Sequence, residues 1–132
     1  MKIKIEKQND GTYIAYNITG DNVQIIGTGE TVAEAKDDFL NSIAEMKESV
    51  AADGDAMPKE LLEDLEFNFD ICSLFEYYKV LNVTAFAKSI GLNDSLMRQY
   101  KKGDTYISDV QLSKIEAGIH KLGQELSSLR LV

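Results

Sequence analysis

The sequence predicts an α+β protein, with a small antiparallel sheet and one packed helix in its N-terminal part and an all-α C-terminal part. Three observations lead to this prediction. Short segments before residue 30 alternate polar and apolar residues between turn sequences. Apolar residues recur at steps of three and four over most of the chain after residue 31. The charge balance changes near residue 70, so we expect two domains, 1–70 and 71–132.

The first part begins with strands. Alternating segments predict three of them, at 2–7, 13–18 and 23–27. The sequences NDG at 9–11 and GDN at 20–22 are turn signals, and such short connections predict an antiparallel meander. A similar alternation at 65–69 indicates a fourth strand.

A long helix follows the third strand. Thr31 and Glu34 have the spacing of a capping box, in which each side chain satisfies a backbone N–H at the helix start. The loop expected at 51–59 contains the only proline of the chain, Pro58. Between these limits a single apolar stripe is expected to pack on the sheet: Val32, Ala35, Phe39, Ile43, Met46 and Val50.

Two further helices are expected at the ends of the second part. Asp70 can cap a helix with the apolar stripe Ile71, Leu74, Phe75, Tyr78 and Leu81. Ser108 and Gln111 fit another capping box, which opens a helix with the heptad-like stripe Leu112, Ile115, Ile119, Leu122, Leu126 and Leu129.

The final helix is long enough to do more than complete the domain. We expect the first half of its stripe to pack on the preceding helices, and Leu122, Leu126 and Leu129 to form a dimer contact. Gly118 and Gly123 each weaken the helix by about 1 kcal/mol relative to alanine. They therefore mark a close approach of another helix or a break.

The segment 85–103, AFAKSIGLNDSLMRQYKKG, predicts two short helices joined by a glycine turn. Ala87 and Gly91 are four residues apart, which places a small residue at a helix crossing and glycine where the chain turns through positive φ. The inner face of the first short helix is expected to consist of Val83, Phe86, Ala87 and Ile90. That of the second is expected to consist of Leu92, Leu96 and either Tyr100 or Met97.

The outer face of the second short helix carries side chains that suit nucleic acid. Ser95, Arg98, Gln99, Lys101 and Lys102 can hydrogen-bond base edges or neutralise phosphates. We expect a DNA-binding site made of these five residues, with Asn93 capping the helix near a phosphate and Tyr106 reaching the DNA backbone.

With helices before and after it, the segment resembles the helix-turn-helix domains of the phage-repressor (Cro/C1-like) superfamily. The resemblance implies that the second helix enters the major groove and that the protein dimerises to read two half-sites. The alternative is a glycine-linked helix pair of the kind common in all-α domains.

Charge is distributed unevenly along the chain. Residues 1–70 contain six basic and 16 acidic residues, a net charge of −10, whereas residues 71–132 have a net charge of +2. This asymmetry predicts DNA for the second part and a basic protein for the first. Equally, acidity can serve only to keep the chain in solution.

The first part resembles the N-terminal domain of HicB-type antitoxins. The resemblance rests on the three opening strands, the sequence GETVAEA at 29–35, which matches the Gly-x-Thr-x-x-Glu-Ala step of that family, and the amphipathic helix that follows. The turn after the second strand departs from the family pattern and retains only Gly20. Many HicB-type antitoxins also continue into a C-terminal helix-turn-helix, so the resemblance covers the whole chain.

This resemblance implies a partial RNase H-like fold in the first domain and a function without catalysis. The protein would neutralise a small basic HicA-type toxin that cleaves mRNA and would repress its own operon by binding operator DNA as a homodimer or higher homo-oligomer. One alternative is a standalone transcriptional regulator whose N-terminal domain binds a small ligand or supports dimerisation. Another is an adaptor protein without DNA binding.

No residue pattern indicates an enzyme, a cofactor or a metal site. The carboxylates of the first part lie on expected turns and on an outer helix face, which does not suit two-metal hydrolysis. His120 has no cysteine or second histidine near it in the sequence, and Cys72 is the only cysteine. Without a signal sequence or an apolar run of about 20 residues, the chain is expected to be cytoplasmic and not bound to a membrane.

Overall fold

The computed structural model describes residues 1–132 and contains two compact units, Met1–Lys79 and Val80–Val132. The expected division after residue 70 is therefore nine residues too early. Helix α2 (Ile71–Tyr77) belongs to the first unit, because its N-cap residue Asp70 and its residue Glu76 both accept hydrogen bonds from backbone groups of that unit. Lys7 N–H donates to Asp70 Oδ2 at 3.0 Å, and Val32 N–H donates to Glu76 Oε2 at 2.9 Å.

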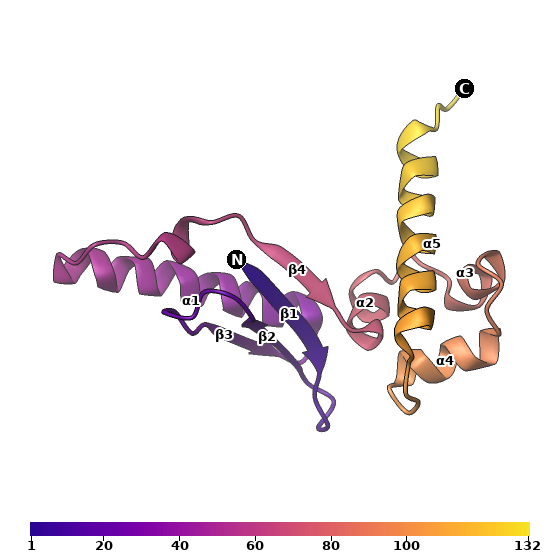
Figure 1. Ribbon diagram of the computed structural model, residues 1–132, viewed down its shortest axis with the longest axis horizontal. Coiled ribbons are helices and arrows are strands. Elements are labelled where there is room, and N and C mark those ends of the chain that lie inside the picture. The colour runs from indigo at the N-terminus through magenta and orange to yellow at the C-terminus, as the bar shows by residue number, and fades with distance from the viewer. The chain divides into compact units, whose positions relative to one another are not determined.

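A four-stranded sheet forms one layer of the first unit (Figure 1). The strands are β1 (Lys2–Lys7), β2 (Tyr13–Asn17), β3 (Ile26–Gly29) and β4 (Glu66–Phe69), and they lie in the order β3-β2-β1-β4. The meander β1–β2–β3 is antiparallel, as the short connections predicted. However, β4 runs parallel to β1, so the sheet is mixed and not wholly antiparallel. The long return through the helix and loop brings the chain back to the end of the sheet where β1 starts.

The third strand begins later than expected because a side chain replaces part of the backbone ladder. Asn17 Nδ2 donates to the Val23 carbonyl at 2.7 Å, and its Oδ1 accepts from Ile25 N–H at 2.8 Å. Val23 and Ile25 are buried in the core. The segment 23–25 therefore has the burial of a strand, whereas β3 itself starts at Ile26.

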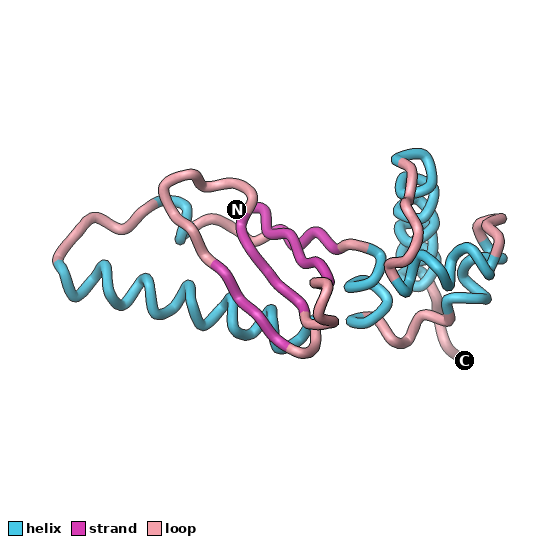
Figure 2. The backbone as a smooth tube through the Cα atoms, turned by 90° about the horizontal axis from the view of Figure 1, so that it is seen from below, coloured by secondary structure: helices cyan, strands magenta, loops and turns pink.

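Helix α1 (Val32–Asp53) covers one face of the sheet, which Figure 2 shows from below. Thr31 Oγ1 accepts from Glu34 N–H at 3.1 Å, and the helix ends at Gly54 with φ 72°. Its contact with β3 is very close, because a Cβ on Gly27 would lie 2.3 Å from the Phe39 backbone nitrogen. Only glycine fits at this crossing.

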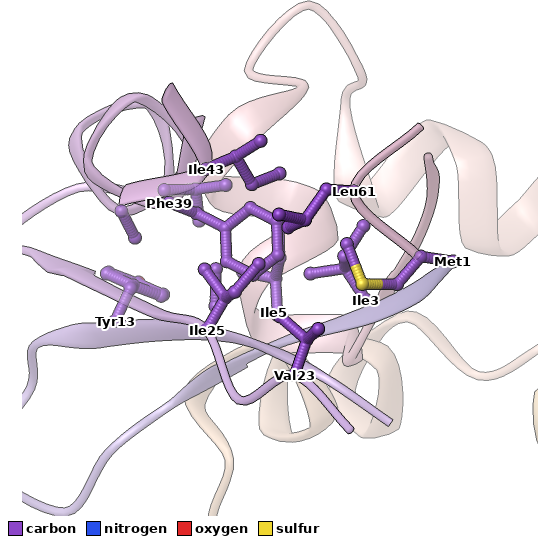
Figure 3. Packing of buried hydrophobic residues seen from close by; sticks show 12 residues of the cluster. Met1, Ile3, Ile5, Tyr13, Val23, Ile25, Phe39, Ile43 and Leu61 are labelled. Atoms are coloured by element: carbon purple, nitrogen blue, oxygen red, sulfur yellow. The ribbon is translucent and has the colours of Figure 1, made fainter. Parts of the chain in front are cut away.

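The core of the first unit lies between α1 and the sheet. Figure 3 shows Phe39 and Ile43 of α1 beside Ile5 and Ile25. The short 3-10 helix η1 (Lys59–Leu62) adds Leu61. The first four residues of the predicted α1 stripe are buried, namely Val32, Ala35, Phe39 and Ile43. Met46 is partly buried against the same core.

The second unit consists of α3 (Val83–Ser89), α4 (Asp94–Lys102) and α5 (Asp109–Ser128). On the inner face of α4, Tyr100 and its alternative Met97 are both buried, whereas Leu96 is only half-buried. The core of this unit is Phe86, Ala87, Leu92, Met97, Tyr100 and Ile115. None of the helices in the chain is long and apolar enough to cross a membrane.

The two glycines of α5 have different surroundings. A Cβ on Gly118 would lie 2.4 Å from Ile90 Cγ2 and 3.3 Å from Phe86 Cζ, so this glycine marks the close approach of another element. A Cβ on Gly123 would meet nothing within 4 Å.

These two positions form a matched pair for a stability test. Gly123→Ala should raise the free energy of unfolding by about 0.5–1 kcal/mol, because it only removes backbone freedom in a helix. Gly118→Ala should lower it by about 1–3 kcal/mol, because the β-branched Ile90 must move. Urea unfolding of both variants measures the difference, and equal effects would contradict the close packing of α5.

Candidate nucleic-acid interface

The turn between α3 and α4 is built as the sequence predicted. Gly91 has φ 71°, and the Leu92 N–H donates to the Ala87 carbonyl at 2.9 Å. Ala87 is fully buried, so the second helix passes close to the first. Lys114 Nζ of α5 lies 3.4 Å from the Gly91 carbonyl and supports the turn from the other side.

A side-chain cap at its start and a glycine at its end determine the length of α4. Asn93 Oδ1 accepts from Leu96 N–H at 3.0 Å, so the predicted role of Asn93 as the helix cap is confirmed. Gly103, with φ 83°, ends the helix and directs its N–H to the Gln99 and Tyr100 carbonyls. With both ends capped, α4 has a defined length and a defined outer face.

The five side chains expected on the outer face of α4 are all exposed: Ser95, Arg98, Gln99, Lys101 and Lys102. All except Lys101, which flanks the buried face, lie opposite the buried Met97 and Tyr100. Tyr106 follows in the loop after α4 and is 86% exposed. The structure thus brings the predicted polar and basic residues together on one surface of the second unit, with Tyr106 close to them in sequence.

Among the residues of this surface, Arg98 already forms several hydrogen bonds within the protein. Its Nη1 donates to Asp94 Oδ2 at 2.9 Å and to Thr84 Oγ1 at 3.0 Å, and its Nη2 donates to Ser95 Oγ at 3.1 Å. Thr84 lies on α3, so the guanidinium joins the two short helices. To reach a base, Arg98 must exchange these hydrogen bonds for new ones.

Asp94 and Thr84 join the site through Arg98 and are not among its predicted residues. The spacing of Asp94 and Arg98, four residues apart on one helix, is a signal for such an ion pair. Nothing in the sequence indicates Thr84, because its contact with Arg98 spans 14 residues and depends on how α3 and α4 cross.

Hydrogen bonding from Arg98 holds the pKa of Asp94 below its ordinary value of 3.8. The first turn of α4 therefore carries a carboxylate at neutral pH, and Arg98 balances its charge. This pair reduces the positive charge at the start of the helix. The free positive charge lies at the other end, where Lys101 and Lys102 form no ion pair.

Gln99 has one internal partner, since its Oε1 accepts from Thr105 Oγ1 at 3.1 Å. The amide nitrogen remains available to donate, and a glutamine amide can also pair with an adenine edge when it is released. The outer face of α4 thus carries Arg98, which is held by internal hydrogen bonds, and Gln99, whose amide is oriented by Thr105. It also carries two lysines without an ion pair, Lys101 and Lys102.

Helix α5 extends beyond α3 and α4 toward its C-terminal end (Figure 1), and the residues of its apolar stripe become exposed there. Ile115 is 1% exposed, Leu122 is half-buried, and Leu126 and Leu129 are 57% and 60% exposed. Helix α5 ends at Ser128, so Leu129 is its C-terminal cap residue and not part of the helix. The stripe predicted for a dimer contact is therefore available on its last two turns.

Charge follows the two units closely. Met1–Lys79 contains 17 acidic and seven basic residues, a net charge of −10, whereas Val80–Val132 has a net charge of +2.

No group of three or more histidine, cysteine or carboxylate side chains is arranged to hold a metal ion. Comparison of the chain with protein-family models, with curated proteins and with solved structures finds no match.

The Asp94–Arg98 pair predicts a pH dependence. Because the folded-state pKa of Asp94 is lowered, its contribution to stability is complete above the unfolded value and is lost as pH falls through the folded pKa. A carbon-13 NMR titration of the Asp94 carboxyl should give a pKa below 3.8, and Arg98→Gln should return it to the ordinary range. An unchanged midpoint in Arg98→Gln would contradict the internal pairing of Arg98.

Proposed function

We propose that this protein is a HicB-type antitoxin that binds operator DNA through its second unit and a small basic HicA-type toxin through its first. The observation that carries the proposal is the outer face of α4. A helix held by a buried inner face presents Ser95, Gln99, Lys101 and Lys102 to solvent, next to a tight glycine turn. This is the arrangement that a recognition helix needs in order to enter the major groove.

Within this proposal the polar residues have different tasks. Ser95 and Gln99 contact base edges, and Lys101 and Lys102 contact phosphates. Asn93 places the start of α4 near a phosphate, and Tyr106 reaches the DNA backbone. Arg98 contributes to DNA binding only after it releases Asp94 and Thr84, so its net contribution is smaller than that of a free arginine.

Dimerisation belongs to the same proposal, since one helix of nine residues gives a small footprint on DNA. Leu122, Leu126 and Leu129 at the end of α5 form the contact, because they continue a stripe that is buried at Ile115. Two copies would then read two half-sites whose centres lie about 34 Å apart.

The toxin is assigned to the first unit because of its charge. A net charge of −10 attracts a basic protein, speeds encounter and disfavours acidic partners. A HicA-type toxin must bind RNA and is therefore basic. Binding there would cover the RNA-binding surface of the toxin and so neutralise it.

Variants of α4 test the DNA-binding part. With DNA from upstream of the reading frame, Gln99→Ala should cost about 1–3 kcal/mol of binding free energy, and Arg98→Ala should cost less because an internal ion pair is also released. Lys102→Ala should lower the salt dependence by about one counterion, whereas the charge-matched control Lys121→Ala on α5 should not. Binding is measured by fluorescence anisotropy at several salt concentrations. Footprinting of the complex should show the two half-sites, and unchanged affinity in Gln99→Ala would remove α4 as the reading helix.

A pull-down tests the antitoxin part. The tagged protein, isolated from its native host, should retain a small basic protein in fixed stoichiometry, which mass spectrometry identifies. High salt should release this partner, because charge attraction contributes to the complex. Recovery of DNA alone would instead favour a standalone regulator, and recovery of neither would contradict both parts.

A further inference from the structure

The two edge strands of the sheet, β3 and β4, differ in whether their outward backbone groups are hydrogen-bonded. At the β3 edge, side chains of α1 occupy the outward backbone groups. Thr28 N–H donates to Asp38 Oδ2 at 2.8 Å, and Ser42 Oγ donates to the Ile26 carbonyl at 3.2 Å. This edge is closed to a further strand, because its donor and its acceptor are already used.

The β4 edge is open. Glu66 N–H bonds the Met1 carbonyl and Asp70 N–H bonds the Ile5 carbonyl, both at 3.0 Å, so the even-numbered residues of β4 face β1. In a parallel pair the alternate residues direct their backbone groups to the other side. The N–H and C=O groups of Phe67 and Phe69 therefore point away from β1. Strand β4 is the border strand on this side of the sheet (Figure 1).

An aromatic cluster lies on the α1 side of this open edge. The Phe69 ring stacks on Tyr77 at 5.9 Å and meets Tyr78 edge-on at 6.0 Å, and Lys36 Nζ lies 4.5 Å from the centres of the Phe67 and Tyr77 rings. Tyr77 and Tyr78 are 37% and 43% exposed although they are large apolar rings. Exposed tyrosines of this kind are enriched at protein interfaces.

The opposite side of the same edge carries Glu66 and Asn68 of β4, which are in register with Lys2 and Lys4 of β1. Glu66 is exposed there, and Asp70 follows at the end of β4. A strand added beside β4 would thus place alternate side chains next to carboxylates on one face and next to Phe67 and Phe69 on the other.

We propose that the β4 edge, Glu66–Phe69, binds an extended strand of a basic protein, which adds to the sheet with basic and apolar residues in alternation. This inference rests on the proposed function, and it assigns the surface that the basic partner uses. Main-chain hydrogen bonds to Phe67 and Phe69 supply affinity, and the alternation of side chains supplies specificity.

A second copy of the chain is the less suitable occupant of this edge. A two-fold antiparallel pairing that uses the same backbone groups would set the Glu66 carboxylate of each copy opposite the Asp70 carboxylate of the other. Like charges directly opposite each other destabilise a strand pair. It would also bring together two units that each carry a net charge of −10.

The probe is an acetylated six-residue peptide of alternating lysine and valine, titrated into the nitrogen-15-labelled full chain at low salt. A peptide with the same composition, three lysines followed by three valines, is the control. The alternating peptide should slow amide hydrogen exchange at Phe67 and Phe69 at least tenfold and leave Thr28 unchanged. Equal binding of the two peptides would contradict strand addition, and so would changes confined to the acidic residues of α1.

Two variant pairs separate charge from backbone pairing. Glu66→Lys should weaken peptide binding at least tenfold. Glu45→Lys makes the same charge change at an exposed position of α1 and should have little effect. Phe67→Pro removes an outward N–H that the sheet does not use, so it should bind at least tenfold more weakly than Phe67→Val. Equal losses within the Glu66/Glu45 pair would overturn the proposal even if Phe67→Pro does not fold.

The pull-down distinguishes this inference from the proposed function. Glu66→Lys should lose the basic partner while it retains operator DNA, and Glu45→Lys should retain both. Full retention of the partner by Glu66→Lys would refute the β4 edge and leave the antitoxin proposal intact. Self-association of the free protein that Phe67→Pro abolishes would instead assign the edge to a second copy.

Discussion

The close packing of α1 on β3 is the constraint on which the first unit depends. Gly27 allows the helix backbone to approach the strand so closely that even a methyl group would not fit. At this distance Asp38 and Ser42 reach the outward backbone groups of β3 and close that edge. On the opposite edge, Phe67 and Phe69 are only partly buried. This one contact therefore accounts for the protection of the β3 edge, which the β4 edge lacks.

In the second unit, Arg98 connects structure to electrostatics. Its guanidinium bonds Asp94 on its own helix and Thr84 on α3, so it contributes to the crossing of the helix pair as well as to the charge of the surface. The result is an uneven distribution of charge along α4. Its first turn is balanced, and its last turn carries the unpaired Lys101 and Lys102. A helix of this kind is attracted to a polyanion mainly at its C-terminal end.

Features that depend on neighbouring residues were predictable from the sequence. The caps at Thr31, Asp70, Asn93 and Ser108 all appear in the structure, because each is a side chain that accepts from a backbone N–H three residues later. The pairing of β4 was not predictable, because a strand segment carries no local signal for the direction of its neighbour. The same holds for the division of the chain, where α2 joins the first unit through contacts made far away in the sequence.

For the candidate site, the sequence by itself determined which side chains of α4 face outward, because helical periodicity separates the buried Met97 and Tyr100 from the polar residues. It also determined that Gly91 makes the turn, since the backbone there has positive φ. Only the tertiary structure decided that Arg98 is engaged by Thr84 and that Gly118 must stay small. The physical reason is that both depend on the distance between helices, which long-range packing sets and local sequence does not.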